Sequence, residues 1–124
     1  MTILNSIKVN GKYNQRKLDV LTTIYYYTVN LNYPGLTLLE LVPLTGASYY
    51  YLKVRLPKFA NSNLEWRHRY LLRGTTERNN RAVFIYSLSA YGRSWLEEKI
   101  PRDMFNQTVT RLRPLWKPNV LHRL

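Results

Sequence analysis

The sequence contains no cysteine, few acidic residues and no long apolar run. Without cysteine the chain forms no disulfide bond, has no thiol nucleophile and offers no thiolate ligand to zinc. No stretch reaches the roughly 18 apolar residues of a transmembrane helix, and residues 1–17 lack the layout of a signal peptide. These absences favour a cytoplasmic protein without a membrane-spanning segment.

Patterns typical of catalysis and metal binding are also missing. The acidic residues include no pair at helical spacing on an apolar face, and the adjacent Glu97 and Glu98 point in different directions on a helix. No phosphate-binding glycine loop or nucleophile elbow is present. His68 and His122 are far apart and have no carboxylate at metal-ligand spacing. We therefore expect no enzyme activity, no metal site and no cofactor.

Positive charge is what the sequence has in excess. The 124 residues carry 19 Lys and Arg against 7 Asp and Glu, a net charge of +12, and 45% of them are hydrophobic, which favours one folded domain. Such a surplus favours a polyanionic partner, most often nucleic acid, because phosphate contacts release counterions. An anionic membrane surface is the competing partner. Residues 47–81, with eight basic and two acidic side chains, hold half of the net charge.

The first part of the chain has the patterns of two helices. In residues 15–32 apolar side chains recur at helical spacing, and a Pro-Gly pair ends the pattern. The three tyrosines of residues 25–27 are spread around this helix, and we expect part of them in the core. Thr37 and Glu40 have the spacing of a capping box at the start of a second, short helix, which ends at the tight turn supplied by Gly46.

A third helix is predicted over residues 48–59, with Ser48 as its cap. A step of about 100° per residue sorts its side chains into two sides. The side expected in the core consists of Tyr49, Leu52, Leu56 and Phe59. The outward side consists of Tyr50, Tyr51, Val54 and Lys58, flanked by Lys53 and Arg55.

Residues 66–73 and 82–88 alternate with the period of two that indicates β-strands. We expect a hairpin whose turn occupies the segment between them, with Asn79 and Asn80 able to take positive φ. In the first strand the even-numbered residues, including Leu72, are expected to face inward, and the outer face is mostly basic. The arginines at or near the tip are Arg73, Arg78 and Arg81.

Two further helices are predicted at the end of the chain. Ser89 caps one over residues 90–100, and the other covers residues 103–113 and ends at Pro114. The remaining residues are expected to be extended. The inward side of the first of these helices consists of Tyr91, Trp95 and Leu96. The apolar stripe of the second consists of Phe105, Val109 and Leu112, and it packs either on a partner subunit or on the first helix.

Together these elements predict an α+β, mainly α fold. The order of three helices, a basic hairpin and a further helix resembles the winged helix-turn-helix domains of small transcriptional regulators such as the PadR and MarR families. Three segments of residues 15–100 carry the resemblance. The recognition helix is matched by YYYLKVRLPKF, the passage from the second wing strand into the next helix is matched by YSLSAYGRSWLEE, and the arginine-tipped hairpin looks like the wing.

The resemblance implies a winged helix-turn-helix domain over residues 15–101, with a three-helix core and a two-stranded wing. Residues 1–14 would form an N-terminal arm. Residues 102–124 would form a C-terminal helix and extended tail, a candidate dimerisation segment. The helix at 48–59 would read the major groove, and the wing at 69–88 would contact the DNA backbone or the minor groove.

The resemblance also assigns roles to single residues. Those expected at base edges are Tyr50, Tyr51, Val54 and Lys58. Those expected at phosphates are Lys53 and Arg55, and those expected to reach a minor groove from the wing are Arg78 and Arg81. Ser48, Arg69 and Arg73 complete the set of candidate DNA-binding residues.

We therefore expect a sequence-specific transcriptional regulator that binds double-stranded DNA as a homodimer in the cytoplasm, at the nucleoid. The alternative is an architectural nucleoid protein that coats DNA with little base preference, which the diffuse positive charge of the C-terminal part suits. An RNA-binding module is a third interpretation, because exposed tyrosines also stack on single-stranded bases.

Overall fold

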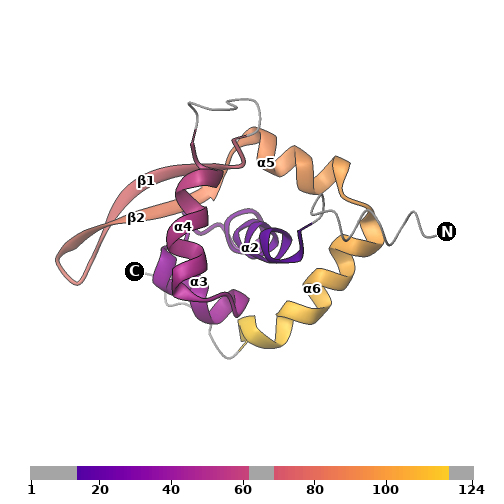
Figure 1. Ribbon diagram of the computed structural model, residues 1–124, viewed down its shortest axis with the longest axis horizontal. Coiled ribbons are helices and arrows are strands. Elements are labelled where there is room, and N and C mark those ends of the chain that lie inside the picture. The colour runs from indigo at the N-terminus through magenta and orange to yellow at the C-terminus, as the bar shows by residue number, and fades with distance from the viewer. Residues whose placement is uncertain (1–13, 62–68, 118–124) are drawn as a thin grey trace.

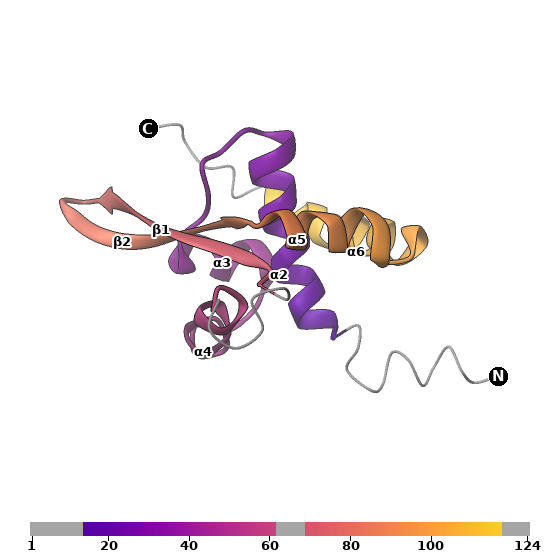
Figure 2. The same cartoon turned by 90° about the horizontal axis from the view of Figure 1, so that it is seen from above.

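The structure is mainly helical and contains an antiparallel β-hairpin, which confirms the predicted α+β, mainly α class (Figure 1). It is a computed structural model that describes residues 14–61 and 69–117. Helix α2 lies at the centre, with the other helices around it, and the hairpin extends away from them (Figure 2). The elements are α2 (Gln15–Tyr25) with the π-helical turn η1 (Tyr26–Asn30), α3 (Leu38–Thr45), α4 (Tyr49–Phe59), β1 (Leu71–Arg78), β2 (Arg81–Leu88), α5 (Ala90–Ser94) with the π-helical turn η3 (Trp95–Lys99), and α6 (Arg102–Trp116).

Helix α2 is the centre of the hydrophobic core. Asn14 caps its start, because the Asn14 side chain accepts a hydrogen bond from the backbone amide three residues later at 3.0 Å. Residues 18–24 are all buried, so the helix is enclosed rather than amphipathic. In the following turn η1, Tyr27 is 2% exposed. Tyr25 and Tyr26 pack partly against the same core, which confirms the expectation for this tyrosine triplet.

Helix α6 packs against α2 and shares its core. Thr108, Leu112 and Trp116 of α6 are buried. Phe105 meets Tyr25 edge to face, with 5.7 Å between the ring centroids. Of the two alternatives left by the sequence, the described structure places the apolar stripe of this helix on the first helix of the same chain.

The prediction that Pro114 ends the last helix is wrong, because α6 continues through it to Trp116. A proline inside a helix costs about 3 kcal/mol. Trp116 offsets this cost: its ring stacks on Tyr26 at 4.5 Å between centroids, and its indole N–H donates to the Thr23 hydroxyl at 3.3 Å. Burying a large aromatic ring contributes about as much as the proline removes. The start of the tail is thus helical, and residues 118–124 lie outside the described residues.

A tight turn joins α3 to α4. Thr37 and Glu40 form the predicted capping box: the Thr37 hydroxyl accepts from the Glu40 amide at 3.2 Å, and the Glu40 carboxylate accepts from the Thr37 amide at 2.9 Å. Gly46 ends α3 with φ at 77°, a region that favours glycine. Ser48 caps α4, since its hydroxyl accepts from the amide three residues later at 3.0 Å. Both helix starts and the turn were predicted correctly.

The first strand of the hairpin lies later in the chain than predicted, and the turn is shorter. The strands pair over their full length, which leaves only Asn79 and Asn80 in the turn. Both have the predicted positive φ, at 55° and 64°, as in a type I′ turn, whose twist matches that of paired strands. Because two residues are enough for this turn, residues 74–78, which were expected in it, are paired in β1 instead. A backbone bridge between Leu36 and Tyr86, with hydrogen bonds of 2.9 and 2.8 Å, extends the pairing on the other edge of β2.

The inward and outward sides of β1 differ at its start from those predicted. Leu71 is fully buried, whereas Leu72 is 43% exposed. Tyr70 precedes the strand, because its amide donates to the Phe59 carbonyl and its carbonyl accepts from the Ser89 amide, both at 3.0 Å. Leu71 is therefore the residue of β1 that faces the core, at the point where the hairpin meets it. The earlier part of the predicted strand lies outside the described residues.

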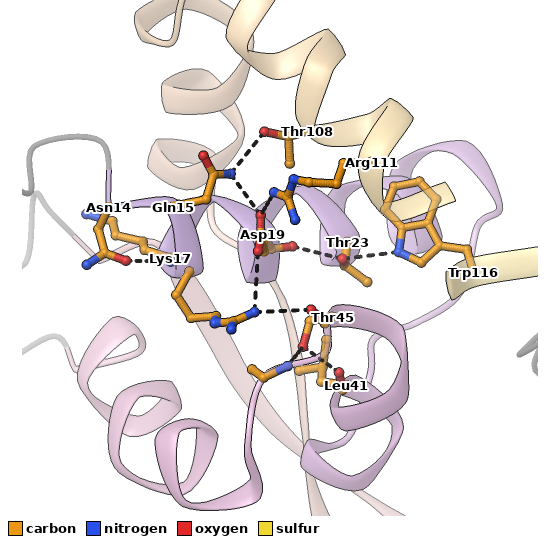
Figure 3. Close-up of polar contacts among 12 residues, drawn as sticks. Asn14, Gln15, Lys17, Asp19, Thr23, Leu41, Thr45, Thr108, Arg111 and Trp116 are labelled. Carbon is orange, nitrogen blue, oxygen red and sulfur yellow. Dashed lines mark hydrogen bonds and ion pairs between the residues drawn. The ribbon is translucent and has the colours of Figure 1, made fainter. Parts of the chain in front are cut away.

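A buried carboxylate connects α2, α3 and α6 (Figure 3). Asp19 is 1% exposed and accepts hydrogen bonds from Gln15 at 2.9 Å and from the Arg111 guanidinium of α6. Arg16 lies 3.6 Å from the second oxygen of Asp19 and donates to the Thr45 carbonyl at the end of α3 at 3.4 Å. One buried charge therefore helps to fix the position of α3 and of α6 on the central helix.

Lys17 lies among aromatic rings near the start of α2. Its ammonium is 3.9 Å from the centre of the Tyr70 ring and 4.9 Å from the centre of the Trp95 ring. Burial lowers the pKa of Lys17 to about 8, because desolvation disfavours the charged form. The two ring faces attract the ammonium and oppose this effect. Lys17 is thus a cation held in a partly desolvated aromatic site.

We expect Lys17 to make the stability of the fold depend on pH. Its folded-state pKa of about 8 is below the ordinary value of 10.5, so the unfolded chain binds more protons between these values. Relative to a Lys17→Met variant, the free energy of unfolding of the unsubstituted chain therefore rises between about pH 8 and pH 10.5. Urea unfolding of both chains across this range measures the difference in their free energies of unfolding. Tyrosine ionisation affects both chains alike and so cancels from this difference. A difference that stays constant with pH contradicts the prediction.

Candidate nucleic-acid interface

The exposed side of α4 carries positive charge and no acidic residue of its own helix. Residues 48–59 contain three basic and no acidic side chains. The residues that hold the helix on the core are Leu52, Leu56 and Phe59. Lys58 on the opposite side and Lys53 at its flank are exposed, and neither forms an ion pair with any residue of the two described ranges. Tyr50 is 75% exposed on the same side, so this surface can offer both cations and an aromatic ring.

Tyr49 and Tyr51 occupy places opposite to those predicted. Tyr49, expected in the core, is 51% exposed and lies on the side of the hairpin. Tyr51, expected outward, packs partly against the core, and burial raises its pKa. The first turn of α4 extends past the core, which leaves Tyr49 uncovered. Tyr51 instead faces the start of α2, where Arg16 and Asp19 are close enough to act on the phenol.

The other predicted α4 residues differ in accessibility. Ser48 is exposed, but its hydroxyl already accepts the capping hydrogen bond. Val54 is half-buried. Arg55 is exposed, and its guanidinium lies 5.8 Å from the centre of the Tyr51 ring. The predicted α4 side chains that remain fully available are therefore Tyr50, Lys53 and Lys58, with Arg55 at their edge.

Arg78 is held against α3 and does not extend from the tip of the hairpin, as the resemblance implied. Its guanidinium lies 3.4 Å from Glu40 and donates to the Glu77 carbonyl at 3.1 Å. Glu40 can bind it because one carboxylate oxygen serves the capping box and the other faces the hairpin. Arg78 therefore connects the hairpin to the start of α3.

The remaining hairpin arginines are placed in different ways. Arg73 lies 4.2 Å over the ring of Phe84, and Arg69 donates to the Leu71 carbonyl at 3.3 Å. Arg81 is exposed, and its guanidinium forms no ion pair with a residue that the structure describes. Arg81 is thus the hairpin cation most available to a partner.

A groove of about 560 Å³ runs between the hairpin and the start of α3 and α4. Tyr49 lines it from α4, Leu39 from α3, and Asn79 and Phe84 from the hairpin. Leu39 is 70% exposed and Phe84 50% exposed, so both leave apolar surface in water. The groove brings together the two elements that the sequence marked as basic.

Sequence reasoning did not single out Leu39 or Phe84 for this surface. Residues 38–42 contain four apolar side chains, which cannot all face the core from one short helix. This excess was a usable signal for Leu39. Phe84 gave none, because it shares its side of the strand with the buried Tyr86 and is exposed only because the hairpin extends beyond the core.

Two further features of the described residues concern membranes and metal ions. No helix in residues 14–61 and 69–117 is long and apolar enough to cross a membrane. Within the same ranges, no three His, Asp or Glu side chains are grouped as metal ligands are. His68 and His122 lie outside the described residues.

Comparisons with protein-family models, with curated proteins and with solved structures find no match for this chain. A functional interpretation therefore depends on the arrangement of its own residues.

Proposed function

We propose that the chain is a DNA-binding protein of the winged helix-turn-helix type. In this proposal α4 enters the major groove and the β1–β2 hairpin is the wing. The order of elements supports it: two helices joined at Gly46, a hairpin directly after the second of them, and the Leu36–Tyr86 bridge that adds a strand position beside β2. Helix-turn-helix proteins place the second helix of such a pair in the major groove.

The observation that carries the proposal is the exposed positive charge of α4, a helix without any acidic residue. Lys53 and Lys58 are exposed on the side away from the core and have no carboxylate near them in their own helix. Solubility alone does not require a helix that contains basic residues and no acidic ones. Phosphates supply the missing negative charge, and Tyr50 between the two lysines can contact base edges.

A sequence-specific regulator that binds as a homodimer is the form of this function that we propose. An architectural protein is the second candidate, since the net charge of +12 also suits binding that depends on phosphates alone. Selecting bound oligonucleotides from a random pool separates the two. Equal affinity for selected and random DNA at every salt concentration excludes the regulator.

We expect the Lys53→Ala/Lys58→Ala double variant to bind DNA more weakly and with less dependence on salt. Each phosphate contact contributes about 0.9 to the slope of log affinity against log salt concentration, so the slope falls by about 2. Both lysines are exposed and unpaired with described residues, so the variant should fold normally. Fluorescence anisotropy with a labelled duplex across a potassium chloride series measures the slope.

A matched control removes two lysines elsewhere on the surface. Lys99 and Lys117 are also exposed, and neither belongs to α4 or to the hairpin. The Lys99→Ala/Lys117→Ala variant should keep a slope close to that of the unsubstituted chain. An equal loss in both double variants would assign binding to charge spread over the whole surface and would end the assignment to α4.

A further inference from the structure

The groove between the hairpin and the α3–α4 corner has aromatic walls and a polar end. Tyr49 and Phe84, from opposite sides, are each about half exposed. Leu39 adds apolar surface, and the Glu40–Arg78 pair lies at the polar end. A volume of about 560 Å³ is within the range of small-molecule sites, which combine apolar walls with a few polar groups. Exposed apolar patches of this kind usually mark binding surfaces.

We propose that this groove takes a nucleobase of an unpaired nucleotide. The inference extends the proposed function, because it specifies which state of the nucleic acid the same surface prefers. In an intact duplex the faces of each base are covered by stacking, so its bases cannot lie between Tyr49 and Phe84. A base in a single-stranded, bulged or flipped-out position can.

The aromatic side chains fit a base better than they fit an aliphatic ligand. Stacking on an aromatic ring is available to every base, and proteins that bind single strands use it together with a positively charged path for the backbone. The Arg73 guanidinium lies 4.2 Å over one face of the Phe84 ring, so it adds positive charge at this aromatic wall, and the half-exposed ring has its other face for a base. A base brought by a phosphodiester chain would satisfy both the rings and the charge.

The polar groups of the groove match the edge of a base. The Asn79 side chain carries both a donor and an acceptor, and it lies in the groove at the two-residue turn. Arg78 donates and Glu40 accepts, and their contact at 3.4 Å is long enough to be exchanged for contacts with a ligand.

Charge complementarity selects a nucleotide over an apolar peptide as the occupant. The groove opens between α4, with three basic and no acidic residues, and a hairpin whose Arg81 is exposed and unpaired with described residues. A peptide would gain only from the apolar walls. An unpaired nucleotide would gain from the walls and from the cations, because its base contacts the rings and its flanking phosphates contact the basic side chains.

The test compares three labelled probes of the same sequence: a duplex, that duplex with unpaired nucleotides at its centre, and the single strand. Fluorescence anisotropy gives the affinities, and 2-aminopurine at the unpaired position reports stacking by quenching. We expect the unpaired probes to bind about tenfold more tightly than the duplex. The Tyr49→Ala/Phe84→Ala variant should lose this preference and the quenching, because each base–ring stack is worth about tenfold in affinity.

Leu72→Ala is the matched control, because Leu72 is a 43% exposed apolar side chain of the same hairpin. It should keep the preference for unpaired probes. Equal affinity of the unsubstituted chain for duplex and unpaired probes overturns the inference and leaves DNA binding standing. No binding to any probe overturns both.

Two further outcomes would also overturn the inference. One is a preference for unpaired probes that survives in the Tyr49→Ala/Phe84→Ala variant, which would place the base elsewhere. The other is sedimentation showing a dimer that this variant abolishes, because a second copy of the chain would then cover the groove.

Discussion

The Gly92→Ala variant is expected to lose a large part of the stability of the fold. A Cβ atom added at Gly92 would lie 2.1 Å from the Tyr70 carbonyl oxygen and 3.0 Å from its carbon, far inside contact distance. Neither side can move away. The Tyr70 carbonyl is bound by the Ser89 amide at 3.0 Å, and the Ser89 hydroxyl caps α5 by accepting from the Gly92 amide at 2.9 Å.

The cost of this clash is comparable with the whole stability of a small domain. Overpacking against side chains that yield costs about 1–3 kcal/mol, and here the neighbour is backbone. We therefore expect a loss above about 4 kcal/mol, against a total of about 5–15 kcal/mol for a domain. Thermal unfolding followed by circular dichroism measures it.

Gly74→Ala provides the control for the loss of glycine itself. A Cβ atom at Gly74 meets its nearest neighbour, the Ile85 side chain, at 3.7 Å, which is an ordinary contact. This variant should unfold within a few degrees of the unsubstituted chain. A Gly92→Ala chain that melts at the same temperature as the Gly74→Ala chain would show that α5 does not dock on Tyr70 as described.

The Arg111→Met variant is expected to lose about 3 kcal/mol of unfolding free energy, because it leaves the buried Asp19 carboxylate with only its longer ion pair to Arg16. Asp19 is 1% exposed, and its other cation, Arg16, is 3.6 Å away. Methionine keeps most of the apolar stem of the arginine side chain, so the effect reports the lost charge. Urea unfolding gives the free energy.

A double-mutant cycle separates the ion pair from packing. In the Asp19→Asn background no buried charge remains, so Arg111→Met should cost about 1 kcal/mol or less. The coupling between the two positions is then about 2 kcal/mol. Additive losses would show that Arg111 stabilises the chain through its stem alone, and that the network in Figure 3 is not what holds α6 on α2.

Local hydrogen-bonding patterns were predictable from the sequence. The Thr37–Glu40 capping box, the Ser48 cap and the positive φ of Asn79 and Asn80 all follow from residues at most three positions apart. Short-range geometry determines these features, so little tertiary context is needed to predict them.

The tyrosines of α4 were not predictable in the same way. A helical wheel gives the angle of each side chain but does not say what covers it. Tyr49 has a core-facing angle and is still exposed, because α4 begins beyond the edge of the core. Tyr51 has an outward angle and is partly buried, because α2 passes beside it.

Long-range pairing also decided which charges are available. Arg78 and Arg81 are equivalent in the sequence, three residues apart at the tip of a basic hairpin. Only the folded chain brings Glu40 to Arg78 and leaves Arg81 in solvent. The groove of Leu39, Tyr49 and Phe84 has the same origin, since its three residues come from three different elements.

The sequence by itself determined the class of fold, the starts of the helices, the positive φ of Asn79 and Asn80 and the excess of positive charge, because each depends on composition or on neighbours along the chain. The tertiary structure alone decided which tyrosine is exposed, which arginine is unpaired and where α6 ends. These depend on contacts between residues far apart in sequence, such as Glu40 with Arg78 and Trp116 with Tyr26. Burial and pairing at such contacts outweigh the local preferences that the sequence displays.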